Sequence, residues 1–288
     1  MRRLSVPGGM PLVGLLCYCL VLSPFSTCMR SKPVIENIGY VPSLKFFKSL
    51  STDQKELTAA SLVFKVLMYY GGLLTHAPAG QLFSQPPDLR GMSRLLHGAV
   101  QLDPYNMDAY YFAQSFLTWD ARQYKVANEL LDYGMKYRTW DWQLPYFAGF
   151  NAAFFLKDAT KAADYYQTAG ELSGQPLHRS LASRYLQESG QTELAIAYLS
   201  SMVRTAKNEA IKQTYLVRLE SFREVRRIEL ARDQFRAKHQ EQPESVEQLV
   251  RTGYLHPAPS DPYGGRFYLD HMGRVTSTSK FAFTSKSK

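Results

Sequence analysis

The chain has 288 residues, of which 45% are hydrophobic and 20% are charged, and this composition excludes an intrinsically disordered protein. The formal net charge is +9, but the basic residues are spread along the chain and acidic residues usually lie near them. This distribution argues against a nucleic-acid-binding stripe.

Residues 1–29 have the layout of a targeting segment. A basic start, Met1-Arg2-Arg3, precedes the apolar run Leu12–Leu22, and no further charged residue occurs before Arg30. This layout predicts a cleaved secretory signal peptide or, as an alternative, a retained N-terminal membrane anchor. Pro24 is expected to end any helix in this segment.

All three cysteines of the chain, Cys17, Cys19 and Cys28, lie in this segment. The four residues that end at Cys28 are similar to a bacterial lipoprotein signal, although Phe25 and Thr27 depart from its usual residues, so lipidation of Cys28 is a third alternative. Each alternative exports the body of the protein, which we expect in the periplasm, anchored to the inner membrane or held as an outer-membrane lipoprotein. The body itself has no cysteine and so neither a disulfide framework nor a cysteine zinc site.

A linker is expected over residues 30–56, and a repeated pattern follows over residues 57–206. Anchor residues in the pattern recur every 33 to 35 positions, and each is followed four residues later by a large side chain. The four anchors are Met92, Ala127, Ala162 and Ala195. A small side chain lets two helices approach closely, and one helix pair cannot bury its own apolar face, so successive pairs must stack. We therefore expect an all-α fold, a solenoid of helix–turn–helix repeats.

The pattern resembles the tetratricopeptide repeat (TPR), a unit of about 34 residues. Tyr110 and Tyr146 stand at its early aromatic position, and Arg179 stands there in the next repeat. The longer spacings imply one-residue insertions in loops. Within the repeats, Gly190 is expected to end a first helix, and Asp158 and Thr192 are expected to cap second helices.

Residues 207–241 are expected to form one long helix. Its apolar residues lie roughly on one stripe: Ile211, Tyr215, Leu219, Phe222, Val225, Ile228 and Phe235. A helix of this kind can cap the end of the solenoid. A dimerising coiled coil is the alternative, which leaves the oligomeric state open.

Residues 242–280 are expected to form a C-terminal module, followed by a disordered tail over residues 281–288. The module begins with a short helix that ends near Arg251, where Gly253 acts as its stop signal. Two β-like runs then follow, Arg266–Leu269 and Arg274–Thr278, which indicate a hairpin.

The run Asp261-Pro262-Tyr263-Gly264-Gly265 resembles the C-terminal loop of type II secretion pseudopilins. Together with the TPR-like body, this tail resembles a group of exported bacterial TPR proteins of the cell envelope. The pseudopilin loop can hold calcium, but turn-forming and capping roles are favoured here for Asp261 and Asp270.

No catalytic motif is present. The sequence has no P-loop, no glycine-rich dinucleotide motif, no zinc-protease motif and no serine-hydrolase motif, and its six histidines are not at ligand spacing. We therefore expect no enzyme, no catalytic residue, no cofactor and no metal site.

TPR arrays bind peptides mostly on the concave face, which the first helix of each pair forms. The resemblance implies a partner-binding groove at these positions: Tyr111, Ser115, Trp119, Phe147, Asn151, Phe155 and Arg184. The neighbouring aromatics Tyr110, Phe112, Tyr146 and Phe150 are expected to pack between helices. Aromatic residues replace the leading lysine of the repeats that grip a C-terminal carboxylate, which favours an apolar or amphipathic segment as ligand.

These features predict a non-enzymatic scaffold or assembly factor in the bacterial cell envelope, which binds a protein or peptide partner and associates with the membrane through its N-terminal segment. A pilus, secretion or surface-filament system is the expected context. The alternative is a permanent structural subunit of an envelope complex or extracellular filament, with the aromatics as subunit interface. An accessory to an envelope enzyme or a glycan binder is a third hypothesis, without further support in the sequence.

Overall fold

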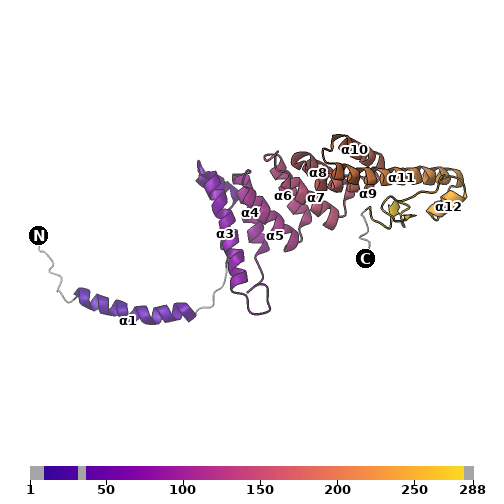
Figure 1. Cartoon of the computed structure of the whole chain (residues 1–288). Coiled ribbons are helices and arrows are strands. Elements are labelled where there is room, and N and C mark those ends of the chain that lie inside the picture. Colours follow the sequence, from indigo (N-terminus) through magenta and orange to yellow (C-terminus); the bar gives the residue numbers. More distant parts are fainter. Residues whose placement is uncertain (1–9, 32–36, 282–288) are drawn as a thin grey trace. The chain divides into compact units, whose positions relative to one another are not determined.

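The computed structural model describes residues 10–31 and 37–281 of the chain. The described residues are mostly helical and include one short C-terminal β-hairpin, which confirms the expected fold class (Figure 1). The chain divides into two compact units, residues 1–41 with 64–92 and residues 42–63 with 93–288. Each unit is described by itself.

The first unit contains α1 (Met10–Ser31), the second half of α3 (Lys55–Thr75) and the first turn of α4 (Leu89–Leu102). Asp88 fixes the start of α4, because its Oδ1 accepts a hydrogen bond from Gly91 N at 2.9 Å. The core of the unit consists of Ile38, Val41, Val66, Tyr69, Leu73 and Met92.

Helix α1 continues through Pro24 to Ser31, so the expectation that this proline ends the helix was wrong. A proline removes one backbone donor, and the helix retains the bonds on either side of it. Two helices among the described residues are long and apolar enough to cross a membrane, judged by length and composition: Val13–Arg30, with none of it buried, and Lys55–Thr75, with 33% buried. Cys28 lies exposed on α1, and residues 1–9 of the predicted signal lie outside the described residues.

The second unit begins with α2 (Leu44–Ser51) and continues with helix pairs that stack in chain order. Part of the predicted linker is therefore helical, while its residues 32–36 lie outside the described residues. The pairs are α5 (Met107–Trp119) with α6 (Tyr124–Met135), α7 (Gln143–Phe150) with α8 (Ala159–Ser173), and α9 (Pro176–Glu188) with α10 (Thr192–Thr205). The helix–turn–helix repeats predicted from the sequence are thus present.

The alanine anchors of the repeats are buried where helices approach each other. Ala127, Ala162 and Ala195 are fully buried. Close approach also explains Gly134, because a Cβ at this position would lie 2.8 Å from the ring of Tyr110. The turn between α5 and α6, residues 120–123, is one residue longer than the turns 156–158 and 189–191, so this insertion lies in a loop as expected.

The turns between paired helices follow the predicted capping chemistry in part. Asp158 caps α8 by accepting from Lys161 N at 3.0 Å, and Gly190 takes the left-handed conformation after α9 with φ +81°. Thr192 does not cap α10, contrary to the prediction. Its hydroxyl instead donates to Glu229 Oε1 at 2.8 Å, because the buried Glu229 carboxylate on α11 (Glu209–His239) requires a donor.

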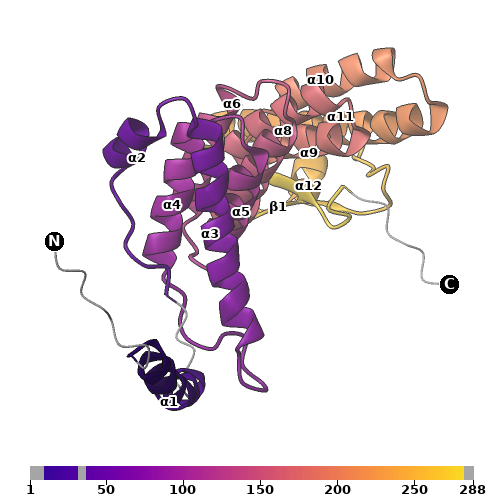
Figure 2. The same ribbon diagram turned by 90° about the vertical axis from the view of Figure 1, so that its left-hand side faces the viewer.

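Helix α11 buries the predicted apolar stripe from Tyr215 to Phe235 against α10 and the C-terminal module. The module consists of α12 (Val246–Arg251) and the antiparallel strands β1 (Phe267–Leu269) and β2 (Val275–Ser277), in which Tyr268 pairs with Thr276. Figures 1 and 2 both show α12 and the hairpin beside α11.

A buried carboxylate joins the parts of the C-terminal module. Asp261 accepts hydrogen bonds from Tyr263 N at 3.0 Å, from Ser279 Oγ at 2.7 Å, and from the hydroxyl groups of Ser277 and, on α11, Ser221. Its oxygens therefore serve turn and packing roles. Phe281, the first residue of the predicted tail, is buried against Phe222, whereas residues 282–288 lie outside the described residues.

Polar side chains of the helices hold the module through its main-chain carbonyl groups. On α11, Arg227 donates to Pro257 O at 2.9 Å, Arg232 to Gly273 O at 2.7 Å and Arg218 to Phe281 O at 3.2 Å. On α9, Gln187 donates to Val275 O at 3.3 Å. These contacts fix the C-terminal module against the last helices of the solenoid, and those to Gly273 and Val275 hold its hairpin.

Candidate partner-binding surface

A group of aromatic side chains is accessible on α5 and on the helix that α7 forms with the π turn η1 (Asn151–Phe155). Tyr111, Trp119 and Phe154 expose 37%, 57% and 57% of their surface. Three half-buried rings lie beside them, and we call the six residues together the aromatic surface: Tyr111, Trp119, Phe147, Phe150, Phe154 and Phe155.

Ring contacts connect the two helices within the aromatic surface. Tyr111 meets Phe147 edge to face, with ring centroids 5.4 Å apart. Trp119 contacts Phe150 and Phe155 at centroid distances of 6.1 and 5.4 Å. Such contacts hold each ring in place, so a ligand would meet a preorganised apolar surface.

Phe154 lies within a local change of helix type. In η1 the Leu156 N–H donates to Asn151 O at 3.0 Å, five residues earlier. This wider turn shifts the phase of the side chains relative to an α-helix. Phe154 stacks on Phe150 at 5.5 Å with the rings nearly parallel, and more than half of its surface stays exposed. Phe154 is not among the groove positions that the TPR resemblance implies, and no residue type in this segment signals a π turn.

Asn151 does not line the surface, and its assignment to the groove was wrong. The side chain is fully buried. Its Oδ1 accepts from the Thr118 hydroxyl at 3.2 Å, and its Nδ2 donates to Asn128 Oδ1 at 3.0 Å. Asn128 in turn donates to Ala148 O at 3.1 Å. A buried amide needs such partners, so Asn151 joins α5, α6 and α7 from inside.

The remaining predicted groove positions on these helices are reachable to different degrees. Ser115 is exposed on the same face of α5 as Tyr111 and Trp119. Phe155 is half-buried, because its ring stacks on Tyr124 of α6 at 4.2 Å. Phe147 is half-buried beside Tyr111.

The aromatics expected to pack between helices also differ among themselves. Tyr110 is fully buried, its hydroxyl donates to Pro104 O at 3.1 Å, and burial raises its pKa. Tyr146 is half-buried and contacts Tyr166. Phe112 exposes 37% of its surface, so its predicted place in the core was wrong. It lies next to Tyr111 in the helix, where successive side chains diverge by about 100° and both remain outside the buried face.

Arg184 lies on α9, apart from the ring cluster. Its Nε donates to Glu188 Oε1 at 2.8 Å, and its guanidinium group lies 5.6 Å from the ring centroid of Tyr185. Burial by itself would lower the pKa of Arg184, but Glu188 raises it overall. The group is thus held as a cation by its own helix.

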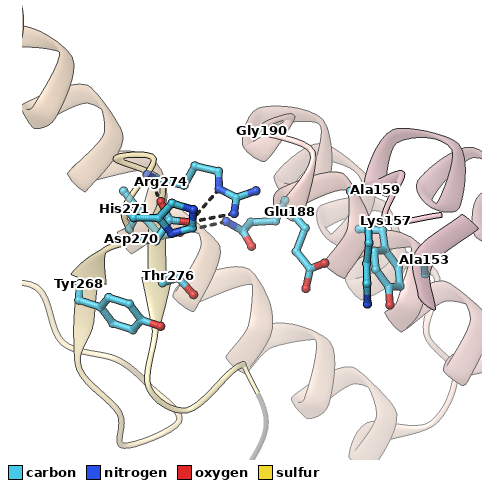
Figure 3. A pocket seen from close by; sticks show the side chains of 13 residues that line it. Ala153, Lys157, Ala159, Glu188, Gly190, Tyr268, Asp270, His271, Arg274 and Thr276 are labelled. Carbon is cyan, nitrogen blue, oxygen red and sulfur yellow. Dashed lines mark hydrogen bonds and ion pairs between the residues drawn. The ribbon is translucent and has the colours of Figure 1, made fainter. Parts of the chain in front are cut away.

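A pocket of about 460 Å³ lies between η1, α9 and the hairpin (Figure 3). Lys157 and Glu188 border it on the helical side, and Tyr268, His271 and Arg274 border it on the hairpin side. Arg274 Nε donates to Asp270 Oδ2 at 2.8 Å. Burial alone would raise the pKa of Asp270, but the hydrogen bonds from Arg274 and Met272 lower it overall.

Within the described ranges, no group of three histidine, cysteine, aspartate or glutamate side chains could hold a metal ion. Asp270 caps its own turn, accepting from the backbone N of Met272 and Arg274 at 2.9 Å each. The oxygens of Asp261 and Asp270 are therefore used by donors of the chain itself.

The structure has a likeness among solved structures, whereas the sequence has no match to a protein family. No protein-family profile matches the chain, and no curated protein matches it in sequence. A solved structure described as "Crystal structure of YrrB: a TPR protein with an unusual peptide-binding site" aligns with 74% of this chain and 100% of its own length, at 16% identity and a TM-score of 0.37. The repeat architecture of the present chain rests on its own helix pairs and their buried small residues.

Proposed function

We propose that the protein is a non-enzymatic scaffold that binds an apolar or amphipathic segment of a protein partner on the aromatic surface. One observation carries this proposal: Trp119 and Phe154, from two different helix pairs, are each more than half exposed and belong to one ring cluster. Large exposed aromatics in contact with each other are typical of interaction sites.

The helical scaffold supports the proposal, because each ring of the surface has a rigid base. Phe155 stacks on Tyr124 and meets Trp119 edge to face, and Phe150 stacks on Phe154. A partner that covers Trp119 and Phe154 therefore loses little additional side-chain entropy on binding. An amphipathic helix with large apolar residues at positions i, i+3 and i+4 fits such a surface.

The test is a double variant, Trp119→Ala with Phe154→Ala, in the full-length protein. We expect partner capture by photo-crosslinking from position Ser115 to be lost, because removing two central anchors weakens binding by at least about 30-fold. The matched control is Leu172→Ala with Leu194→Ala, which removes exposed leucines from second helices of the repeats. Equal crosslinking in both double variants would contradict the proposed binding surface.

We further propose that the protein works in the bacterial cell envelope, in a pilus, secretion or surface-filament system. The apolar and exposed α1 supports export, with the segment cleaved, retained as an anchor or lipidated at Cys28. The intact mass of the protein purified from its native membrane distinguishes the three alternatives. A body found in the cytoplasm with α1 attached would contradict export.

The alternative role, a permanent subunit of an envelope complex or filament, makes a different prediction for the same surface. A permanent subunit should remain in a stoichiometric assembly at low concentration, whereas a scaffold should dissociate. Light scattering on the purified full-length protein and its complex separates the two. The aromatic surface would then be a subunit interface.

A further inference from the structure

The pocket beside the hairpin is continuous with the aromatic surface. Lys157 joins them, because its Nζ lies 5.1 Å from the ring centroid of Phe154 while the same side chain lines the pocket. Ala153, in the π turn next to Phe154, also lines the pocket. A bound segment that covers Phe154 therefore reaches the mouth of the pocket within one or two residues.

Both carboxylates that line the pocket have an arginine partner, whereas the lysine that lines it has no carboxylate partner among the described residues. The Glu188 carboxylate is paired with Arg184 at 2.8 Å, and the Asp270 carboxylate is paired with Arg274 at 2.8 Å. Lys157 is exposed and forms no ion pair within the part of the chain that the structure describes. His271 adds an exposed imidazole on the opposite wall (Figure 3). The pocket thus favours an anionic group at the end nearest Phe154.

The other groups in the pocket suit a small anion with an attached apolar chain. The hydroxyl groups of Tyr268 and Thr276 can donate hydrogen bonds from the hairpin, and Tyr185 and Val275 contribute apolar surface. One unpaired lysine matches one carboxylate, whereas a polyanion such as nucleic acid is bound by several cations together.

We propose that this pocket is a carboxylate-binding subsite, and that the partner segment carries an acidic group directly next to the apolar residues that cover Phe154. The inference rests on the proposed function, since it extends the same binding surface. The C-terminal hairpin then takes part in recognition, because it supplies one wall of the subsite. The carboxylate can belong to an aspartate or glutamate side chain or to the C-terminus of the partner.

The test uses a displayed library of random 12-residue peptides, selected on the full-length protein in nanodiscs, with one library fused at its C-terminus and another with a free C-terminus. Selection of apolar residues followed within one or two positions by Asp or Glu, in the fused library, supports a side-chain carboxylate. Enrichment in the free-terminus library alone supports a terminal carboxylate. Apolar residues without any acidic preference would overturn the subsite and leave the proposed function intact, whereas no apolar enrichment would overturn both.

Lys157→Gln provides the matched measurement on the protein side, with Lys161→Gln on the exposed side of α8 as the control of equal charge. Affinity for a selected acidic peptide, measured by fluorescence anisotropy, should fall about two- to fivefold in Lys157→Gln, as expected for a partly exposed ion pair. Affinity for the same peptide with Gln in place of its acidic residue, or with an amidated C-terminus, should not change. Lys157→Arg should retain the preference for acid. Equal losses in Lys157→Gln and Lys161→Gln would refute the subsite.

Discussion

Asn151 belongs to a buried hydrogen-bond network, which gives it a structural role and not a role in partner binding. The substitution Asn151→Ala distinguishes the two roles. The sequence pattern places Asn151 in the partner groove, whereas the structure buries it between Thr118 and Asn128. A groove residue would lose partner binding when truncated and leave stability unchanged. A network residue would lose stability.

The size of the loss follows from the contacts. The substitution removes two hydrogen bonds, each worth about 1 kcal/mol, and it leaves Asn128 Oδ1 without its donor in a buried position, which costs about 1–3 kcal/mol. We therefore expect the free energy of unfolding to fall by about 3–5 kcal/mol.

Urea denaturation of the full-length protein, followed by circular dichroism, measures this loss. Ser115→Ala is the matched control, because Ser115 is exposed one helix away and its truncation should change the unfolding free energy by less than about 0.5 kcal/mol. A double-mutant cycle between Asn128→Ala and Asn151→Ala should give a coupling energy of about 0.5–3 kcal/mol. If Asn151→Ala has the stability of the wild type, the structural reasoning is refuted.

Four further substitutions test the packing of the second unit. Asp261→Ala should speed amide hydrogen exchange in the hairpin by about 10²-fold relative to α5, because a buried acceptor of four hydrogen bonds is lost. Gly265→Ala should have the same effect, because the new Cβ would lie 2.6 Å from Asp261 Oδ2. Unchanged exchange rates in both variants would contradict the role of the Asp261 network. Burial lowers the pKa of His178 from its usual 6.5, and this effect outweighs a hydrogen bond with the backbone of Ala169 that raises the pKa. The unfolded chain therefore binds the proton more tightly than the folded protein does. Thermal stability should be full above about pH 6.5 and fall below it. In His178→Gln the loss of thermal stability below about pH 6.5 should be smaller than in the wild type. If both proteins lose the same stability as the pH falls, His178 is not a buried neutral imidazole. Thr192→Val should lower the unfolding free energy by about 1–2 kcal/mol, because Glu229 loses its hydroxyl donor, and a neutral result would assign Thr192 no such role.

Features with a regular period were predictable from the sequence. The alanines at the repeat anchors and the apolar stripe of α11 recur with the spacing of helices, and burial follows from that spacing. The hairpin and the cap at Asp158 were predictable as well, since turn chemistry is local.

Features that depend on distant residues or on a change of phase were not predictable. Thr192 looks like a helix cap, but its partner Glu229 lies 37 residues later in the chain. Asn151 was expected in the groove, but its partners Thr118 and Asn128 lie 33 and 23 residues earlier in the chain. The pocket beside Lys157 combines residues from η1, α9 and the hairpin, and no single segment signals it.

The way the hairpin is held has a consequence for how its sequence can vary. Side chains of the helices hold the module by donating to its main-chain carbonyl groups, and every residue type carries such a group. The donors are Gln187, Arg218, Arg227 and Arg232. Exchanges of the exposed hairpin side chains Tyr268 and His271 should therefore leave these hydrogen bonds in place, whereas one residue inserted or deleted between Gly273 and Val275 would shift these two acceptors relative to each other. The wall that the hairpin presents to Lys157 is thus free to change its chemistry while it keeps its position, and relatives of this protein could differ in ligand preference without a change of fold.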